Sequence, residues 1–315
     1  MNACTEKIPL GSTDFRICPL GIGAWAWGDQ FFWGYGRDYR AADIESAARA
    51  CLEAGIDFFD TAEIYGRGQS ERLTGQFVAN SGYPVVIATK FFPYPWRLQK
   101  KSLLHALKAS LQRMNVSAVD LYQIHQPFPP VSVETWADGL ADAVEAGMAK
   151  AVGVSNYNSQ QMRRAHAVLV KRGILLASNQ VEYHLLNRTV EKNGMLDLCK
   201  ELDISLIAYS PLAQGLLTGK YTPDHPLPGI RGRRYNRKIV DLTQRLIRLM
   251  REIGQNHGGK TPSQVALNWV MRKGAIPIPG VKNIAQVEEN AGALGWELTD
   301  GEINELDVLS ESVHA

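Results

Sequence analysis

Short apolar runs alternate with amphipathic stretches along most of this 315-residue chain. Eight of the runs predict buried strands, because each is short, largely apolar and followed by residues typical of turns. Apolar residues spaced three and four apart predict helices between most of them. The predicted strands are 19–25, 56–59, 85–89, 120–124, 149–154, 177–182, 204–208 and 275–279. The predicted helices are 42–54, 70–79 (capped by Ser70), 102–114, 133–146, 159–171, 191–202, 239–255 and 262–273, with another after Asn283.

Two segments depart from this alternation. Residues 8–18 hold two extended runs around a Gly-Ser-Thr-Asp turn, which predicts a β-hairpin plugging one end of the fold. Residues 212–237, rich in Gly, Pro and Arg, predict a long loop after the seventh strand. The pattern favours an α/β fold, a (β/α)8 TIM barrel forming one domain over residues 1–315. A doubly wound open sheet is the alternative, but residues 21–26 lack the third glycine of its phosphate-binding turn.

Composition and charge narrow the class of protein. The chain has 34 Lys and Arg against 32 Asp and Glu and no basic face, so nucleic acid is not expected as a partner. No apolar run could span a membrane and no signal peptide is evident, so we expect a cytoplasmic protein with no membrane partner. The four cysteines are far apart in sequence, and we expect reduced, mostly buried thiols. We expect a monomer, with a homo-oligomer left open.

Four polar side chains follow consecutive predicted strands. Asp60 and Tyr65 follow the second strand, Lys90 the third and His125 the fourth, so on a barrel all four point into one mouth. Taken singly, each has a structural explanation as a core, surface or turn residue. Together they form a set for proton transfer, because an ammonium favours the ionised form of a phenol whose usual pKa is ~10. A carboxylate would hold that ammonium, an imidazole would orient a carbonyl, and no metal is needed.

Aromatic residues gather in two segments beside these strand ends. Six rings lie between residues 27 and 39, and residues 91–96 after Lys90 hold four more. They predict either packing onto the barrel rim or an aromatic pocket wall, and such a wall favours flat or apolar carbonyl compounds.

Several separate motifs, in order, carry a family resemblance. They are GIDFFDTAEIYG at 55–66, ATK at 88–90, VSN at 154–156, NQVEYH at 179–184 and AYSPL at 208–212. With these motifs the chain resembles the aldo-keto reductases from about residue 8 to residue 309. Residues 21–28 and 278–283 most resemble a branch of that family found in plastids and cyanobacteria.

The resemblance implies an NADPH-dependent oxidoreductase that reduces a small aldehyde or ketone to an alcohol. In it Tyr65 is the general acid, Lys90 and Asp60 tune that acid, and His125 orients the carbonyl. Residues 212–237 would act as a lid over NADPH or NADP+. The cofactor-binding residues that the resemblance implies are Gly23, Ala24, Trp25, Asp60, Ser155, Asn156, Gln180, Tyr209, Ser210, Pro211, Leu212, Gln214, Gly215, Lys220, Gly280, Val281, Lys282, Gln286, Glu289 and Asn290.

Two departures from the family pattern limit this transfer. Gln126 stands where many members have a Trp, so one wall of the substrate pocket is not inherited. Gly280-Val281 stands where many have Lys-Ser, which leaves the 2′-phosphate to Lys282, with Gln286 as a second candidate.

One alternative is a cofactor-binding sensor, since a related branch couples cofactor binding to a membrane channel. A metal-dependent barrel lyase or hydrolase is disfavoured, because the strand ends show no cluster of His and carboxylate ligands.

Overall fold

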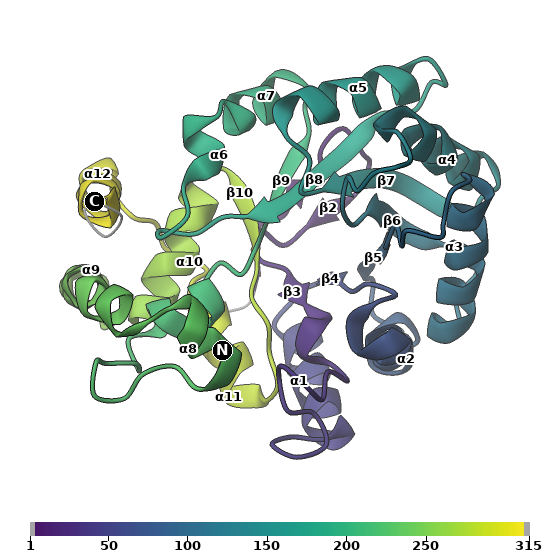
Figure 1. Cartoon of the computed structure of the whole chain (residues 1–315). Helices are drawn as coiled ribbons and strands as arrows, with labels where there is room; N and C mark the ends of the chain where they lie inside the picture. The colour runs from purple at the N-terminus through teal and green to yellow at the C-terminus, as the bar shows by residue number, and fades with distance from the viewer. Residues whose placement is uncertain (1–3, 312–315) are drawn as a thin grey trace.

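The computed structural model, which describes residues 4–311, contains a sheet of eight parallel strands in the order β10-β9-β8-β7-β6-β5-β4-β3. Gly21 N donates to Pro277 O at 3.0 Å and Gly23 N to Pro279 O at 3.1 Å, so the first and last strands meet and the sheet closes. The predicted barrel is confirmed, and Figure 1 shows its helices arranged around the strands. The strands are β3 (Ile22–Gly23), β4 (Phe58–Asp60), β5 (Val86–Phe91), β6 (Val119–Ile124), β7 (Ala149–Ser155), β8 (Leu176–Glu182), β9 (Ser205–Tyr209) and β10 (Ala275–Ile278).

Helices connect successive strands on the outside, as the apolar spacing predicts. They are α1 (Ala41–Glu53), α2 (Gln69–Thr74), α3 (Lys101–Met114), α4 (Val133–Glu145), α5 (Ser159–Val170), α6 (Thr189–Lys192), α7 (Met195–Glu201), α8 (Gly229–Arg234), α9 (Arg237–Asn256), α10 (Pro262–Arg272), α11 (Ile284–Ala291) and α12 (Asp300–Glu311). A π-helical turn, Gly75–Ala79, extends α2. No helix within residues 4–311 combines the length and apolar character needed to cross a membrane.

Three local predictions about helices are wrong or incomplete. The predicted helix 191–202 is two helices, because Gly194 adopts a left-handed φ of 72° between α6 and α7. Ser70 does not cap α2: Gly68 occupies the N-cap, and the Ser70 hydroxyl donates to Ala24 O at 2.7 Å. Two helices are absent from the sequence prediction because few of their residues are buried. Helix α8 lies within the predicted loop 212–237 and has no buried residue, and α12 has only Leu306 and Ser310 buried.

The predicted hairpin is formed by β1 (Ile8–Pro9) and β2 (Arg16–Ile17), which pair antiparallel. Leu10 and Ile17 are fully buried against side chains from the barrel interior, including Phe58 of β4. The hairpin therefore closes one end of the barrel and leaves the other end open to a ligand.

The prediction that all cysteines are reduced is wrong for one pair. Cys4 and Cys18 form a disulfide with their Cα atoms 6.0 Å apart, while Cys51 and Cys199 are buried and free. Backbone hydrogen bonds bring the pair together, since Cys4 N donates to Ala54 O and Cys18 N to the Asp57 carboxylate. Such pairing depends on the folded chain, which the sequence spacing does not reveal.

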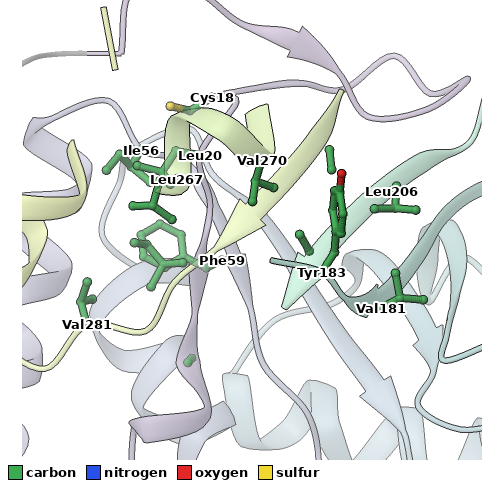
Figure 2. Packing of buried hydrophobic residues seen from close by; sticks show 14 of the residues in the cluster. Cys18, Leu20, Ile56, Phe59, Val181, Tyr183, Leu206, Leu267, Val270 and Val281 are labelled. Carbon is green, nitrogen blue, oxygen red and sulfur yellow. The ribbon is translucent and has the colours of Figure 1, made fainter. Parts of the chain in front are cut away.

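A second buried layer lies between the strands and the outer helices. Leu267 of α10 belongs to one buried cluster with Leu20, Ile56 and Phe59 (Figure 2). Burying each such side chain contributes roughly 1.5–3 kcal/mol relative to leaving it in water. Because Phe59 precedes Asp60, this packing also fixes the end of β4 from which Asp60 projects.

Candidate active site

The four predicted catalytic side chains come from three adjacent strands at the open end of the barrel. Asp60 ends β4, Lys90 lies in β5 and His125 follows β6, while Tyr65 begins a 3₁₀ turn after β4. Gly66 makes that turn possible, because its φ is 54° and a Cβ there would lie 2.7 Å from Gly28 O.

Lys90 connects Asp60 to Tyr65. Its Nζ donates to Asp60 Oδ2, to Thr61 O at 2.9 Å and to Tyr65 Oη at 3.3 Å. The Lys90 side chain is fully buried and that of Asp60 is 2% exposed, so this ion pair is shielded from water. Gln180 Nε2 donates to the other carboxylate oxygen, Asp60 Oδ1, at 2.8 Å. The carboxylate is held on both sides and the ammonium is directed at the phenol.

These contacts shift the pKa values of both proton-carrying groups. Burial lowers the pKa of Lys90, but the charges of Asp60 and Tyr65 raise it and together outweigh burial. The pKa of Lys90 therefore lies above 10.5, and the side chain stays an ammonium. Burial raises the pKa of Tyr65 above 10.0; Lys90 works against this shift and Asp60 adds to it. Tyr65 therefore carries its proton at neutral pH, and Lys90 is the group that eases its removal.

His125 lies against the phenol ring. The two ring centroids are 5.5 Å apart and the rings are nearly perpendicular, at 86°. Asn156 Nδ2 donates to His125 O at 3.1 Å and fixes the backbone there. Burial and the nearby Lys90 charge lower the pKa of His125 to about 3. The imidazole is therefore neutral at physiological pH and can donate or accept one hydrogen bond at the mouth of the site.

A cavity of about 430 Å³ opens above these residues. Asp60, Tyr65 and His125 line it, whereas Lys90 lies beneath. Two of the predicted cofactor-binding residues, Ala24 and Val281, are fully buried outside its lining. The predicted cofactor-binding residues that do line it are Gly23, Trp25, Asp60, Ser155, Asn156, Gln180, Tyr209, Ser210, Pro211, Leu212, Gln214, Gly215, Lys220, Gly280, Lys282, Gln286, Glu289 and Asn290.

Further lining residues were not among the predicted catalytic and cofactor-binding residues. They are Ala26, Trp33, Gln126, Thr218, Arg231, Ile278 and Pro279. Arg231 of α8 is the most informative, because its guanidinium lies over the Trp33 ring at 5.4 Å and donates to Gln214 O at 3.2 Å. The Arg-rich composition of 212–237 and the aromatic loop before Tyr39 are the sequence signals that could have pointed to this pair.

One part of the cavity is suited to a ligand with several negative charges. Lys220, Arg231 and Lys282 line it, and among residues 4–311 none of them has a carboxylate within ion-pair distance. Burial lowers the pKa of Lys282, and the charges of Arg231 and Lys220 lower it further, so an anion bound there would relieve repulsion.

Two buried hydrogen-bond donors and three residues with left-handed φ also lie around this cavity. Asn290 Nδ2 and Trp33 Nε1 are buried donors that have no hydrogen-bond partner in the described part of the chain. Asn156, Ser210 and Gln214 adopt left-handed φ values of 60°, 51° and 55°, which are uncommon for residues other than glycine. Such features suit a phosphorylated nucleotide with polar groups on its base. By contrast, no three His, Cys, Asp or Glu side chains from 4 to 311 gather as a metal site would require.

Comparison with known families decides what kind of barrel this is. The model of the aldo/keto reductase family matches residues 19–311. The chain belongs to this family. It is 40% identical to the chloroplastic pyridoxal reductase of Arabidopsis thaliana over 97% of the chain and 86% of that protein. The aldo-keto reductase motifs of the sequence therefore identify the family correctly.

Solved aldo-keto reductases share the fold over nearly the whole chain. The glycerol dehydrogenase of Gluconobacter oxydans superposes with a TM-score of 0.83 at 27% identity, covering 96% of this chain and 94% of that one. An aldo/keto reductase from Klebsiella pneumoniae, solved in complex with NADP and acetate, gives 0.77 at 26% identity, covering 97% and 95%.

Proposed function

We propose that this aldo-keto reductase uses NADPH to reduce aldehydes or reactive ketones to alcohols, with Tyr65 as the general acid. The observation that carries the proposal is the placement of Lys90, which pairs with Asp60 and contacts Tyr65 Oη at 3.3 Å on the floor of the cavity. The NADP in the related Klebsiella structure supports the choice of cofactor.

The lining residues are suited to hold NADPH along the cavity. Lys220, Arg231 and Lys282 would bind its phosphates, and the unpartnered Asn290 amide would bind its adenine. Near Tyr65, the side chains of Ser155, Asn156 and Gln180 would hold the carboxamide of the nicotinamide. The ring of Tyr209 would stack on the nicotinamide ring. Tyr209 is fixed in place because its hydroxyl donates to Asn156 Oδ1 at 3.0 Å.

NADPH, when bound, supplies the hydride. The protein supplies the proton, which passes from Tyr65 Oη to the carbonyl oxygen of the substrate. The Lys90 ammonium favours the phenolate that remains, and Asp60 keeps that ammonium in place. Neutral His125 beside the phenol holds the carbonyl oxygen in line with Tyr65 Oη.

The substrate end of the cavity is suited to aromatic aldehydes. Trp25 stacks on Phe32 at 4.8 Å and lies 6.2 Å from the Tyr65 ring. Phe92, which is outside the cavity lining, packs edge to face on the His125 ring at 5.6 Å. A flat ring that lies against Trp25 gains contact area and stacking energy. Pyridoxal, the heteroaromatic aldehyde after which the Arabidopsis relative is named, is therefore the first compound to test.

The direct experiment measures NADPH consumption by the purified protein with pyridoxal and a panel of other aldehydes and ketones. We expect turnover that requires NADPH and is unaffected by a chelator, with alcohol formed in equal amount. NADPH binding without turnover on any carbonyl of the panel would contradict the proposal and favour a cofactor-binding sensor.

A further inference from the structure

Four neighbouring strands place a continuous row of residues beneath the active site. Lys90 of β5 pairs in register with Gln123 of β6, Gln123 with Gly153 of β7, and Gly153 with Ser178 of β8. Lys90, Gln123 and Ser178 are fully buried. The row is polar in the barrel interior, where apolar side chains would ordinarily pack.

Gln123 reaches the catalytic carboxylate from this row. Its Nε2 donates to Asp60 Oδ1 at 3.0 Å. Its Oε1 accepts from Ser178 Oγ at 3.4 Å, a long contact that still sets which end of the amide faces Asp60. The donor atoms therefore run in one direction, from Ser178 through Gln123 to Asp60.

Gly153 leaves the space that this contact needs. A Cβ at Gly153 would lie 2.2 Å from Ser178 Oγ and 3.1 Å from Gln123 Cγ. Any larger residue on β7 would push apart the two side chains that meet across it. Burying an amide costs free energy unless its hydrogen bonds are made. The buried Gln123 amide therefore depends on its hydrogen bond to Asp60.

Two amides share Asp60 Oδ1, and they differ in access. Gln180 lines the cavity, where a bound ligand can compete for its amide, whereas Gln123 lies outside the lining. Gln123 is therefore the donor that stays on Asp60 whatever the cavity holds.

We propose that Gln123 is a positioning residue for proton transfer. By holding Asp60 Oδ1, it keeps Oδ2 on Lys90 and so directs the ammonium at Tyr65. Gly153 and Ser178 support it. The inference rests on the proposed function of Tyr65 as the general acid.

The first test replaces Gln123 by methionine, which has a similar volume and no donor. We expect kcat to fall about tenfold to hundredfold, the range for losing a buried hydrogen bond to a charged group, with little change in the Kd of NADPH. The negative charge of Asp60 is then less compensated, so the pKa of Tyr65 rises. The alkaline limb of kcat/KM for reduction should therefore move to higher pH.

Gln123→Glu supplies a rescue that depends on pH. A protonated carboxyl can donate to Asp60 as the amide does, whereas an ionised one repels it. Activity should therefore approach that of the wild type at low pH and fall as pH rises through the pKa of the new carboxyl. A side chain that only filled space would give no such dependence.

Asn268→Leu is the matched control. Asn268 is a buried amide that donates to Ala293 O and Trp296 O and does not line the active-site cavity. It should lower Tm and leave kcat and the pH profile of the folded protein unchanged. A Gln123→Met enzyme with wild-type kcat and pH profile would overturn the inference, and so would a loss matched by Asn268→Leu.

A crystal structure of folded Gln123→Met tests the inference without turnover. We expect the Asp60 carboxylate to rotate and the distance from Lys90 Nζ to Tyr65 Oη to exceed 3.5 Å. An unchanged Asp60, Lys90 and Tyr65 would overturn it. If instead the wild type reduces no carbonyl while this displacement is seen, the proposed function fails and the positioning of Asp60 by Gln123 stands.

Discussion

Lys90 Nζ lies 3.3 Å from Tyr65 Oη and 4.9 Å from the centre of the Tyr65 ring. The ammonium therefore acts on the phenol both through a hydrogen bond and through its charge. Because burial raises the pKa of Tyr65 and Lys90 opposes that shift, the lysine decides how readily the phenol gives up its proton. We therefore expect Tyr65 and Lys90 to act as a single functional unit.

Replacing Tyr65 by phenylalanine tests the acid itself. The ring and its packing against His125 remain, and only the proton donor is lost. General acid catalysis typically supplies about 10²–10⁴-fold, so kcat should fall by at least that much while the Kd of NADPH hardly changes. Cofactor binding is followed by fluorescence and turnover by NADPH consumption. Near-normal turnover in folded, NADPH-bound Tyr65→Phe would remove Tyr65 from its proposed role.

Lys90→Met should also slow reduction, since the phenol loses the ammonium that favours its ionised form. The double variant Tyr65→Phe, Lys90→Met should be hardly slower than either single variant, because the two residues act together. Rate losses that multiplied in the double variant would show that Lys90 acts independently of Tyr65. Far-ultraviolet circular dichroism controls for misfolding, because Met leaves the buried Asp60 carboxylate without its charged partner.

The neutral state of His125 predicts the acid side of the pH profile. Burial and Lys90 lower its pKa to about 3 from 6.5, so kcat/KM should not fall as pH decreases through 6.5. In the unfolded chain His125 takes up a proton near pH 6.5, whereas in the folded protein it does so only near pH 3. Stability should therefore decrease as pH falls across this window, and His125→Gln should lessen the decrease in Tm. A kinetic limb at 6.5 that His125→Gln removes would contradict this.

Much of the fold follows from the sequence pattern because the barrel strands are short and buried on both faces. Runs such as 85–89 and 149–154 correspond to β5 and β7 within two residues at each end. Features that depend on the assembled chain were missed. The Cys4–Cys18 disulfide arises from tertiary contacts, which single-segment patterns do not encode. The break at Gly194 is local by contrast, because it follows from a glycine with left-handed φ inside an otherwise helical run.

The candidate site was predictable where residues follow strands directly. Asp60, Tyr65, Lys90 and His125 could be placed because parallel strands bring their ends to one mouth. Arg231 could not, because its position depends on how residues 212–237 fold back over Trp33. Gln123 was equally hidden, since its alignment with Gly153 and Ser178 depends on strand register.

The cation cluster predicts a preference for NADPH over NADH. Lys282 Nζ lies over the Tyr39 ring at 4.9 Å and the Trp33 ring at 5.2 Å, with Lys220 and Arg231 near enough to lower its pKa. A charge-assisted contact with the 2′-phosphate is worth about 1–3 kcal/mol. Lys282→Ala should therefore raise the Kd of NADPH about tenfold or more and leave that of NADH unchanged.

Lys238→Ala, at an exposed position on α9, is the control for a general change in charge. It should alter neither Kd. Equal weakening of NADPH and NADH in Lys282→Ala would show that Lys282 does not recognise the 2′-phosphate. Arg231→Ala then becomes the next variant to measure, since the Arg231 guanidinium also lines the cavity.

The position of Trp25 predicts which aldehydes react fastest. Trp25 lines the cavity 6.2 Å from Tyr65, so a flat substrate reaching Tyr65 would lie against it. Pyridoxal and other aryl aldehydes should exceed open-chain hexoses in kcat/KM, and Trp25→Leu should reduce that advantage about threefold to tenfold. Propanal, too small to stack, should be little affected. Trp96→Leu is the control, because the Trp96 ring is 72% exposed and outside the cavity lining. It should leave kcat/KM unchanged for aryl aldehydes, for hexoses and for propanal. A wild-type preference for hexoses would contradict the aromatic-aldehyde proposal, because sugar hydroxyls gain little from stacked rings and need hydrogen-bonding partners instead.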